Sequence, residues 1–261
     1  MDSARTASPT APPSTADRWV EFWNRPHSIY ANRRHLEAHF ARIGQDVAEH
    51  LPSDGTVLDF GCGDALAADA MAERCGSLLL FDASPAVRAR LTGRFSGNPR
   101  VRVLDERGLA ALPPGSVDLL LVVSVLQYIP EADLPTLLER WRKLLSPGGR
   151  ALIADVVDPG TPMLADVASQ LRMGWEHGFL TASLVALLRL TLSDYRQVRR
   201  EAGFATYTPD EVLERLEKAG LRGIRLPRNI GPTPHRRSFI AHPRTRTPQD
   251  AEEPAPALNV Q

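Results

Sequence analysis

Hydrophobic residues fall in two patterns along most of the chain. Between residues 27 and 51, apolar side chains from Ile29 to Leu51 recur at the spacing of one helix face, which predicts an amphipathic helix. Further along, short apolar runs stand between turn residues, and such runs are typical of buried strands. They predict strands over residues 56–60, 78–81, 101–104, 117–123 and 150–157.

Helical patterns separate these strands. Pro85 stands at a favoured first-turn position, and Thr208 and Glu211 have the spacing of a capping box. Alternating strands and helices give right-handed crossovers and a parallel sheet with helices on both faces. The helices are predicted over residues 65–74, 133–145 and 208–219, with one more that starts at Pro85.

The alternation stops after the fifth strand. Residues 158–203 have helical patterns with no strand between them, and strands are then predicted over 221–226 and 236–241. A helical insertion at this point lies near the carboxyl ends of the strands, where such sheets bind ligands. We expect it to form a lid or a wall of the ligand pocket; the alternative is extra packing at the sheet edge.

The two ends of the chain differ from the rest. Residues 1–16 and 243–261 are rich in small residues and proline with little to bury, which predicts disordered tails. A chain of 261 residues allows one large domain or two small ones. The α/β pattern resumes after the insertion, and we predict a single domain over residues 17–242.

Composition narrows the function classes. Lys plus Arg and Asp plus Glu both number 31, so no general charge attracts nucleic acid or an anionic membrane. Cys62 and Cys75 are too few for a disulfide framework or a structural zinc site, which favours a reducing, cytoplasmic location. The longest apolar stretch, residues 179–192, is too short for a transmembrane segment. Lysine occurs only at two positions, and we infer a bacterial source with a GC-rich genome.

The sequence VLDFGCGD at residues 57–64 is the sharpest local feature. An apolar strand ends in Gly61-x-Gly63 and runs directly into a helix, which allows close approach of a ligand to the backbone. Dinucleotide enzymes have G-x-G-x-x-G here, with the pyrophosphate at the helix N-terminus. In this chain Leu66 takes the third glycine's place, and Asp64 puts a carboxylate near that phosphate position. Both departures oppose NAD or FAD as the ligand.

Two acidic residues favour a different ligand. Asp59 precedes the glycine loop and suits a ligand with a positive group. Asp82 follows the second strand, where a carboxylate accepts hydrogen bonds from both hydroxyls of a ribose. An adenosine that carries an amine and no phosphate meets these conditions, and S-adenosylmethionine fits that description.

With these features the sequence resembles the class I S-adenosylmethionine-dependent methyltransferases, from Thr56 to Val157 and more weakly to Ala241. The resemblance implies a methyl-transferring enzyme with a Rossmann-like, doubly wound α/β sheet of seven strands whose last strand is antiparallel. It rests on VLDFGCG at 57–63, LFDAS at 80–84, VDLL at 117–120 leading to LQYI at 126–129, and LSPGGR at 145–150.

The resemblance also implies which residues hold the donor. The two glycines would lie under its methionine part, Asp59 would hold its amino end, and Asp82 would bind the ribose hydroxyls. Ala83 would lie against the adenine, and Ser124 would border both donor and acceptor. An acid after the third strand would contact the adenine, and both Asp105 and Glu106 fit, with Asp105 favoured. The implied cofactor-binding residues are Asp59, Gly61, Gly63, Asp82, Ala83, Asp105 and Ser124.

Catalytic residues are less clearly marked. Tyr128, after the fourth strand, and His177, in the insertion, are the candidates for a base. His35 and His39 would share one helix face and could form a metal pair, but no third ligand is evident, so solvated or capping histidines are favoured. No metal is therefore predicted.

The predicted function is methyl transfer to a small-molecule acceptor. The alternative is a protein that binds the donor without transfer, as a sensor or partner subunit. Nucleic acid is disfavoured as the acceptor, because SVLQ at 124–127 replaces the Asn/Asp-Pro-Pro-aromatic motif of amino-methylating nucleic-acid enzymes. The acceptor and the atom that is methylated do not follow from the sequence.

Overall fold

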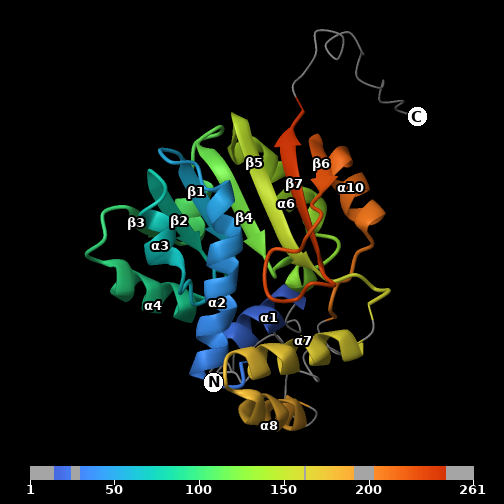
Figure 1. Ribbon diagram of the computed structural model, residues 1–261. Helices are drawn as coiled ribbons and strands as arrows, with labels where there is room; N and C mark the ends of the chain where they lie inside the picture. The colour runs from blue at the N-terminus through green and yellow to red at the C-terminus, as the bar shows by residue number, and fades with distance from the viewer. Residues whose placement is uncertain (1–14, 25–29, 162, 191–202, 245–261) are drawn as a thin grey trace, which may run out of the picture.

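The computed structural model describes residues 15–24, 30–161, 163–190 and 203–244. In this part of the chain one seven-stranded sheet has the order β3-β2-β1-β4-β5-β7-β6, with helices on both faces (Figure 1). β7 pairs antiparallel with β5 and β6, and the other neighbours pair in parallel, which confirms the predicted fold class. The strands are β1 (Thr56–Phe60), β2 (Ser77–Phe81), β3 (Val101–Leu104), β4 (Val117–Val123), β5 (Leu145–Val156), β6 (Leu221–Arg225) and β7 (Arg237–Pro243).

The helices begin where the sequence supplies caps. Ser84 caps the helix after β2 by accepting the Val87 N–H, and Thr208 and Glu211 form the predicted capping box. The helices are α1 (Thr15–Asn24), α2 (Arg33–Val47), α3 (Ala68–Ala72), α4 (Pro85–Phe95), α5 (Glu106–Ala110), α6 (Leu134–Leu144), α7 (Met163–Glu176), α8 (Leu180–Leu190) and α10 (Pro209–Lys218), with 3-10 turns η1 (Ala48–His50) and η2 (Leu126–Tyr128).

Several boundaries differ from those predicted. Asn32 caps α2, so this helix begins later than residue 27. α3 is shorter than the predicted helix because Ala65 has a φ of 45°, outside the helical region. β5 starts at Leu145 and not at residue 150, because the Ser-Pro-Gly-Gly segment continues the strand through a register shift beside β4.

The ends and the insertion are described in part. α1 was not predicted as a helix, and it begins at Thr15, inside the predicted tail. The rest of both predicted tails, residues 1–14 and 245–261, lies outside the described residues. The insertion is helical where it is described, over α7 and α8.

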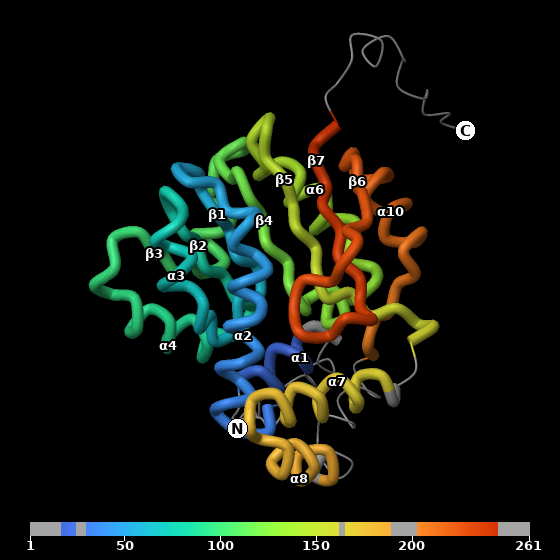
Figure 2. The backbone as a smooth tube through the Cα atoms, in the orientation of Figure 1, coloured from blue at the N-terminus to red at the C-terminus, as the bar shows by residue number. Residues whose placement is uncertain are grey.

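The sheet register brings four strand ends together. Phe60 of β1 pairs with Phe81 of β2, and Val123 of β4 pairs with Ala154 of β5. The loops that follow these parallel strands therefore share one edge of the sheet. α1, α7 and α8 lie at this edge, as the tube view also shows (Figures 1 and 2).

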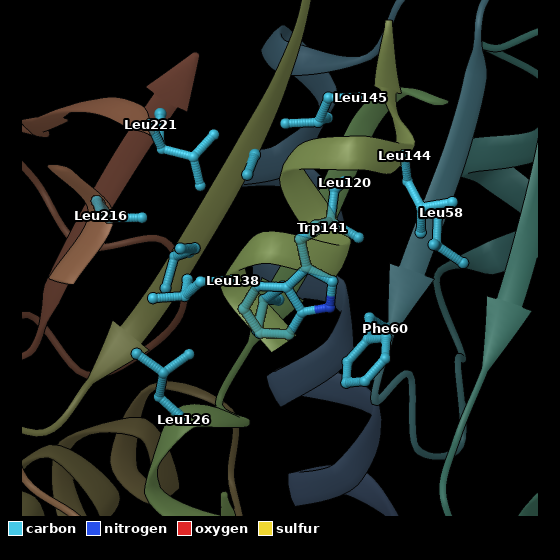
Figure 3. Close-up of a cluster of buried hydrophobic side chains, with 14 of the residues drawn as sticks. Leu58, Phe60, Leu120, Leu126, Leu138, Trp141, Leu144, Leu145, Leu216 and Leu221 are labelled. Carbon is cyan, nitrogen blue, oxygen red and sulfur yellow. The ribbon is translucent and has the colours of Figure 1, made fainter. Parts of the chain in front are cut away.

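Two hydrophobic clusters hold the layers together, one on each face of the sheet. On one face, Trp141 of α6 is fully buried, and its ring lies 5.2 Å from that of Phe60 (Figure 3). On the other face, α3 and α4 pack against the sheet through side chains such as Met71 and Leu91. A Trp-to-Ala change at a site of this kind costs about 3–5 kcal/mol of stability.

Asp118 ties β1 and β4 together at the end of the sheet opposite the ligand edge. Its carboxylate accepts the Thr56 N–H at 2.8 Å and the Ser146 hydroxyl at 2.8 Å. These contacts give Asp118 a structural role, away from the ligand edge. Within the described residues, no helix has the length and apolar character needed to cross a bilayer.

Candidate functional site

A cavity of about 530 Å³ opens at the carboxyl edge of the parallel strands. The loops after β1, β2 and β4, with Asp155 near the end of β5, form its floor, and side chains from α1, α2 and α7 form its walls. Every predicted cofactor-binding residue except Asp105 lines this cavity, and so does Tyr128.

The loop after β1 has the conformation that requires glycine. Gly61 and Gly63 have φ of 77° and 55°, in the left-handed region. A Cβ on Gly61 would also lie 2.5 Å from a methyl carbon of Val125. The Gly61 and Cys62 N–H groups both donate to the Phe81 carbonyl, which fixes the loop against the end of β2.

Asp82 is held rigidly beside this loop. Its Oδ2 accepts the Gly63 N–H at 3.0 Å, and its Oδ1 accepts the Ser84 N–H at 2.8 Å. Each carboxylate oxygen keeps a further lone pair for a ligand hydroxyl. Burial raises the pKa of Asp82, and the two backbone N–H groups oppose that rise. Ala83 follows on the cavity wall.

Asp59 is a carboxylate without a partner. Among the described residues, none donates a hydrogen bond to its side chain, which faces the cavity at the end of β1. Burial and the negative charge of Asp82 raise the pKa of Asp59 to about 7. A cation bound beside it would oppose this shift and stabilise the ionised carboxylate, so the position favours a positively charged group.

A polar network lines the cavity at the ends of β4 and β5. Ser124 and Asp155 both have a φ of 59°, rare for residues other than glycine. The Ser124 hydroxyl donates to Asp155 Oδ2 at 2.6 Å, and Arg236 Nη1 donates to the same oxygen at 2.7 Å. Asn229 Nδ2 donates to the other carboxylate oxygen at 3.0 Å. The network thus holds two strained backbone positions at the edge of the cavity.

Arg236 also links this network to the insertion. Its Nη2 donates to Asp166 of α7 at 3.2 Å, and His235 Nε2 lies 2.8 Å from the same carboxylate. Asp166, Ser169, Gln170 and Met173 place one face of α7 on the cavity. The predicted lid or pocket wall therefore agrees with the position of α7.

Aromatic side chains cover the cavity around Tyr128. The Tyr128 ring lies 4.6 Å from that of Trp19 and 5.5 Å from that of Trp23, both on α1. The Phe204 ring also lies near that of Tyr128, at 5.9 Å. Ring packing of this kind buries a large apolar area.

Two predicted site residues lie elsewhere. Asp105 is exposed, and its Oδ1 caps α5 by accepting the Gly108 N–H at 2.7 Å. Its alternative, Glu106, pairs with Arg88 at 2.8 Å, also outside the cavity. His177 is exposed at the turn between α7 and α8 and does not line the cavity. The adenine contact and the base role stay predictions for these residues.

The structure adds residues that the sequence interpretation did not select. Asp155 and Arg236 line the cavity, and so does His39. From the sequence, His39 was considered only as a possible metal ligand together with His35. His35 is buried and accepts the Ala31 N–H through Nδ1 at 3.1 Å, in agreement with a capping role. Within the described residues, no group of three side chains could hold a metal ion.

Known proteins share this sequence pattern. Residues 32–226 match the family described as "Methyltransferase domain". A ribosomal protein L11 methyltransferase of Thermus thermophilus is 33% identical over 46% of this chain, and a ubiquinone biosynthesis O-methyltransferase of Pseudomonas paraeruginosa is 25% identical over 64%. The chain spans 46% of the length of the first relative and 67% of the second.

Solved structures share the fold. One is the 1,6-didemethyltoxoflavin-N1-methyltransferase of Burkholderia thailandensis, solved with bound 1,6-didemethyltoxoflavin and S-adenosylhomocysteine. Its TM-score is 0.57 at 19% identity. That likeness covers 93% of this chain and 95% of the other. DhpI in complex with S-adenosylhomocysteine has a TM-score of 0.56 at 14% identity, over 89% and 98% of the two chains. The family match and the glycine loop beside Asp82 lead to one conclusion: this chain belongs to the class I S-adenosylmethionine-dependent methyltransferases.

Proposed function

We propose that this protein transfers a methyl group from S-adenosylmethionine to a small-molecule acceptor held in the cavity. The observation that carries the proposal is one cavity lined both by the glycine loop with Asp59 and Asp82 and by a polar group at Asp155. The alternative is a protein that binds the donor without transfer.

The residues present fit the donor. Asp59 lacks a partner and favours a cation, which suits the donor's ammonium group. Asp82 has free lone pairs for the ribose hydroxyls, and Gly61 and Gly63 leave the loop backbone open to the cavity. Ala83 would lie against the adenine, and Ser124 would border the methyl group. These assignments are proposals that follow from position and chemistry.

The chain's own contribution to the reaction is to position the reactants and exclude water. When bound, the donor supplies a methyl group made electrophilic by a sulfonium. Asp59 and Asp82 would fix the donor at two points, which limits its movement toward the acceptor. Trp19, Trp23 and Tyr128 would close the cavity against water, which competes as a nucleophile.

The helices around the cavity favour a small acceptor. Side chains from α1, α2 and α7 stand around the cavity, so a folded protein surface or a nucleic-acid duplex would need those helices to move away. One relative is named as an O-methyltransferase of ubiquinone biosynthesis, and another as a methyltransferase of a ribosomal protein. The absence of a nucleic-acid partner and a cytoplasmic location remain predictions.

Calorimetry tests the donor site. We expect S-adenosylmethionine and S-adenosylhomocysteine to bind with micromolar affinity, and Asp82→Ala to abolish both. Asp54→Ala, at an exposed turn before β1, serves as the matched acidic control and should bind as the wild type does. Binding by Asp82→Ala at wild-type strength would refute the site assignment.

Methyl transfer needs its own measurement. Donor labelled in the methyl group is incubated with fractionated bacterial extracts, and the label is followed into small molecules, protein and nucleic acid. Label in a small molecule supports the proposal, whereas label in protein or nucleic acid contradicts it. Tight donor binding with no transfer to any fraction would favour the donor-binding alternative.

A further inference from the structure

The cavity has an end that the donor residues do not explain. His39 of α2 lines it, and its ring lies 5.3 Å from the Tyr30 ring and 5.6 Å from the Phe40 ring. Among the described residues, no hydrogen-bond partner exists for either ring nitrogen of His39. His35, one helical turn earlier, is instead buried and bonded to the backbone through Nδ1. His39 is therefore an imidazole that faces a ligand space without a protein partner.

The cationic side chains of this space are already neutralised. Within the described residues, the cavity-lining arginines are Arg90 and Arg236. Arg90 pairs with Asp64 at 3.0 Å, and Arg236 pairs with Asp155 at 2.7 Å and with Asp166 at 3.2 Å. At the His39 end, two carboxylates thus face one guanidinium. An acceptor with a negative charge would lose its hydration there without gaining a free cation.

The remaining walls suit a flat ring. Trp19, Trp23 and Tyr128 line the cavity as one group of contacting rings, and the Tyr30 ring lines it beside His39. Aromatic faces bind planar apolar molecules through stacked and edge-to-face contacts. Burial raises the pKa of Tyr30, so its hydroxyl stays neutral and can serve as a hydrogen-bond donor.

We infer that the acceptor is an uncharged, planar molecule with a hydroxyl group on an aromatic ring, and that His39 accepts the hydroxyl proton. The inference rests on the proposed methyl transfer and names its acceptor class. The hydroxyl oxygen forms a bond to the methyl carbon as the carbon–sulfur bond breaks. That bond's electron pair stays on sulfur, which becomes neutral, and the hydroxyl proton moves to a ring nitrogen of His39.

The electrostatic surroundings agree with this role. Burial lowers the pKa of His39 to about 4; Asp155 opposes that shift, whereas His35 and Arg236 add to it. The ring is therefore unprotonated at neutral pH, and it can accept a hydrogen bond from a hydroxyl. Once the proton has moved, the low pKa of His39 favours its rapid release to solvent. An amine acceptor in its free-base form needs no such group during the transfer itself.

Three compounds of one shape test the acceptor class. 1-Naphthol is neutral, 1-naphthoate is an anion, and 1-naphthylmethylamine is a cation at neutral pH. We expect the complex of the protein with S-adenosylhomocysteine to bind 1-naphthol about tenfold or more tightly than either charged compound, as measured by calorimetry. Tighter binding of a charged compound, or no binding of 1-naphthol, would overturn the inference.

Two variants test the proton acceptor. His39→Gln removes the base, and His39→Phe keeps the ring packing against Tyr30 and Phe40. Both should lower transfer to 1-naphthol by about a hundredfold or more and leave S-adenosylhomocysteine binding within twofold of wild type. His242→Gln, exposed on β7, is the control and should transfer as the wild type does.

The outcomes separate the inference from the proposed function. If both His39 variants transfer methyl to 1-naphthol at rates within threefold of the wild-type rate, the role of His39 is overturned. Failure of the wild-type protein to bind S-adenosylhomocysteine would instead overturn the proposed function, because that binding depends on Asp59 and Asp82 and not on His39.

Discussion

At the scale of a single residue, Asp59 should make the affinity for the donor depend on pH. Burial and the neighbouring Asp82 raise its pKa to about 7, so the free protein holds this carboxyl mostly protonated at pH 6. A bound ammonium favours the charged carboxylate. At pH 6 the carboxyl must therefore lose its proton when the donor binds, which costs free energy. Above pH 7 most of the free protein has already lost this proton, so the cost is smaller. Affinity should therefore rise with pH across this range.

We expect S-adenosylhomocysteine to bind about five- to tenfold more weakly at pH 6 than at pH 7.5, with release of about one proton at pH 6. Calorimetry in two buffers of different ionisation enthalpy measures both quantities. Asp59→Asn stays neutral at every pH, so its affinity should be lower and the pH difference should disappear. Equal wild-type affinities at the two pH values would argue against an ammonium contact at Asp59.

The sequence predicts those site residues whose role is set by their immediate neighbours. Gly61 and Asp82 follow apolar strands directly, and strand ends in this fold form the ligand edge. Asp155 and Arg236 are separated widely in the chain and meet only through the pairing of β5 with β7. Asp105 was selected although it lies outside the cavity, because an acid that caps a helix and an acid that binds a ligand look alike in sequence.

At the scale of elements, the strands were predictable because each buried run is apolar and bounded by turn residues. The start of β5 was not, because Ser-Pro-Gly-Gly is usually a turn signal, and its place in the strand depends on close packing. A Cβ on Gly149 would lie 2.8 Å from the Val117 carbonyl oxygen of β4. α1 was missed because its ten residues are anchored by long-range contacts, such as that of Trp19 with Tyr128.

The attachment of α7 to the sheet gives a prediction at this scale. Asp166 is the α7 residue that pairs with Arg236, and it lies near His235. We expect Asp166→Ala to increase hydrogen exchange of the α7 amides at least severalfold while the sheet amides stay protected. The global stability should change by no more than about 1 kcal/mol, because Asp166 is half-exposed and Arg236 keeps Asp155.

Glu176→Ala is the control for this experiment. Glu176 lies at the other end of α7 and pairs only weakly with the exposed Arg172, at 3.9 Å. It should leave the exchange of α7 near the wild-type rate. If Asp166→Ala leaves α7 as protected as before, apolar packing and not the link to Arg236 holds the helix on the cavity.

At the scale of the whole molecule, the hydrophobic clusters and the ligand site are different parts of one sheet. Trp141 packs on one face between α6 and β1, whereas Asp82 lies at the sheet's carboxyl edge. A change in the packed face should lower stability without changing the cavity. A change at the carboxyl edge should weaken ligand binding and lower the stability of the fold only slightly.

Thermal unfolding with and without S-adenosylhomocysteine tests this separation. At about 100 times its Kd, a ligand adds about 2.7 kcal/mol of stability. For a chain of this size each kcal/mol raises Tm by about 2–4 °C, so we expect a rise of about 5–10 °C. Trp141→Ala should melt at a lower temperature, from a loss of about 3–5 kcal/mol, and still show that rise. Asp82→Ala should melt near the wild-type temperature and show none. The reverse result, with the rise lost in Trp141→Ala and kept in Asp82→Ala, would place the donor away from the carboxyl edge of the sheet.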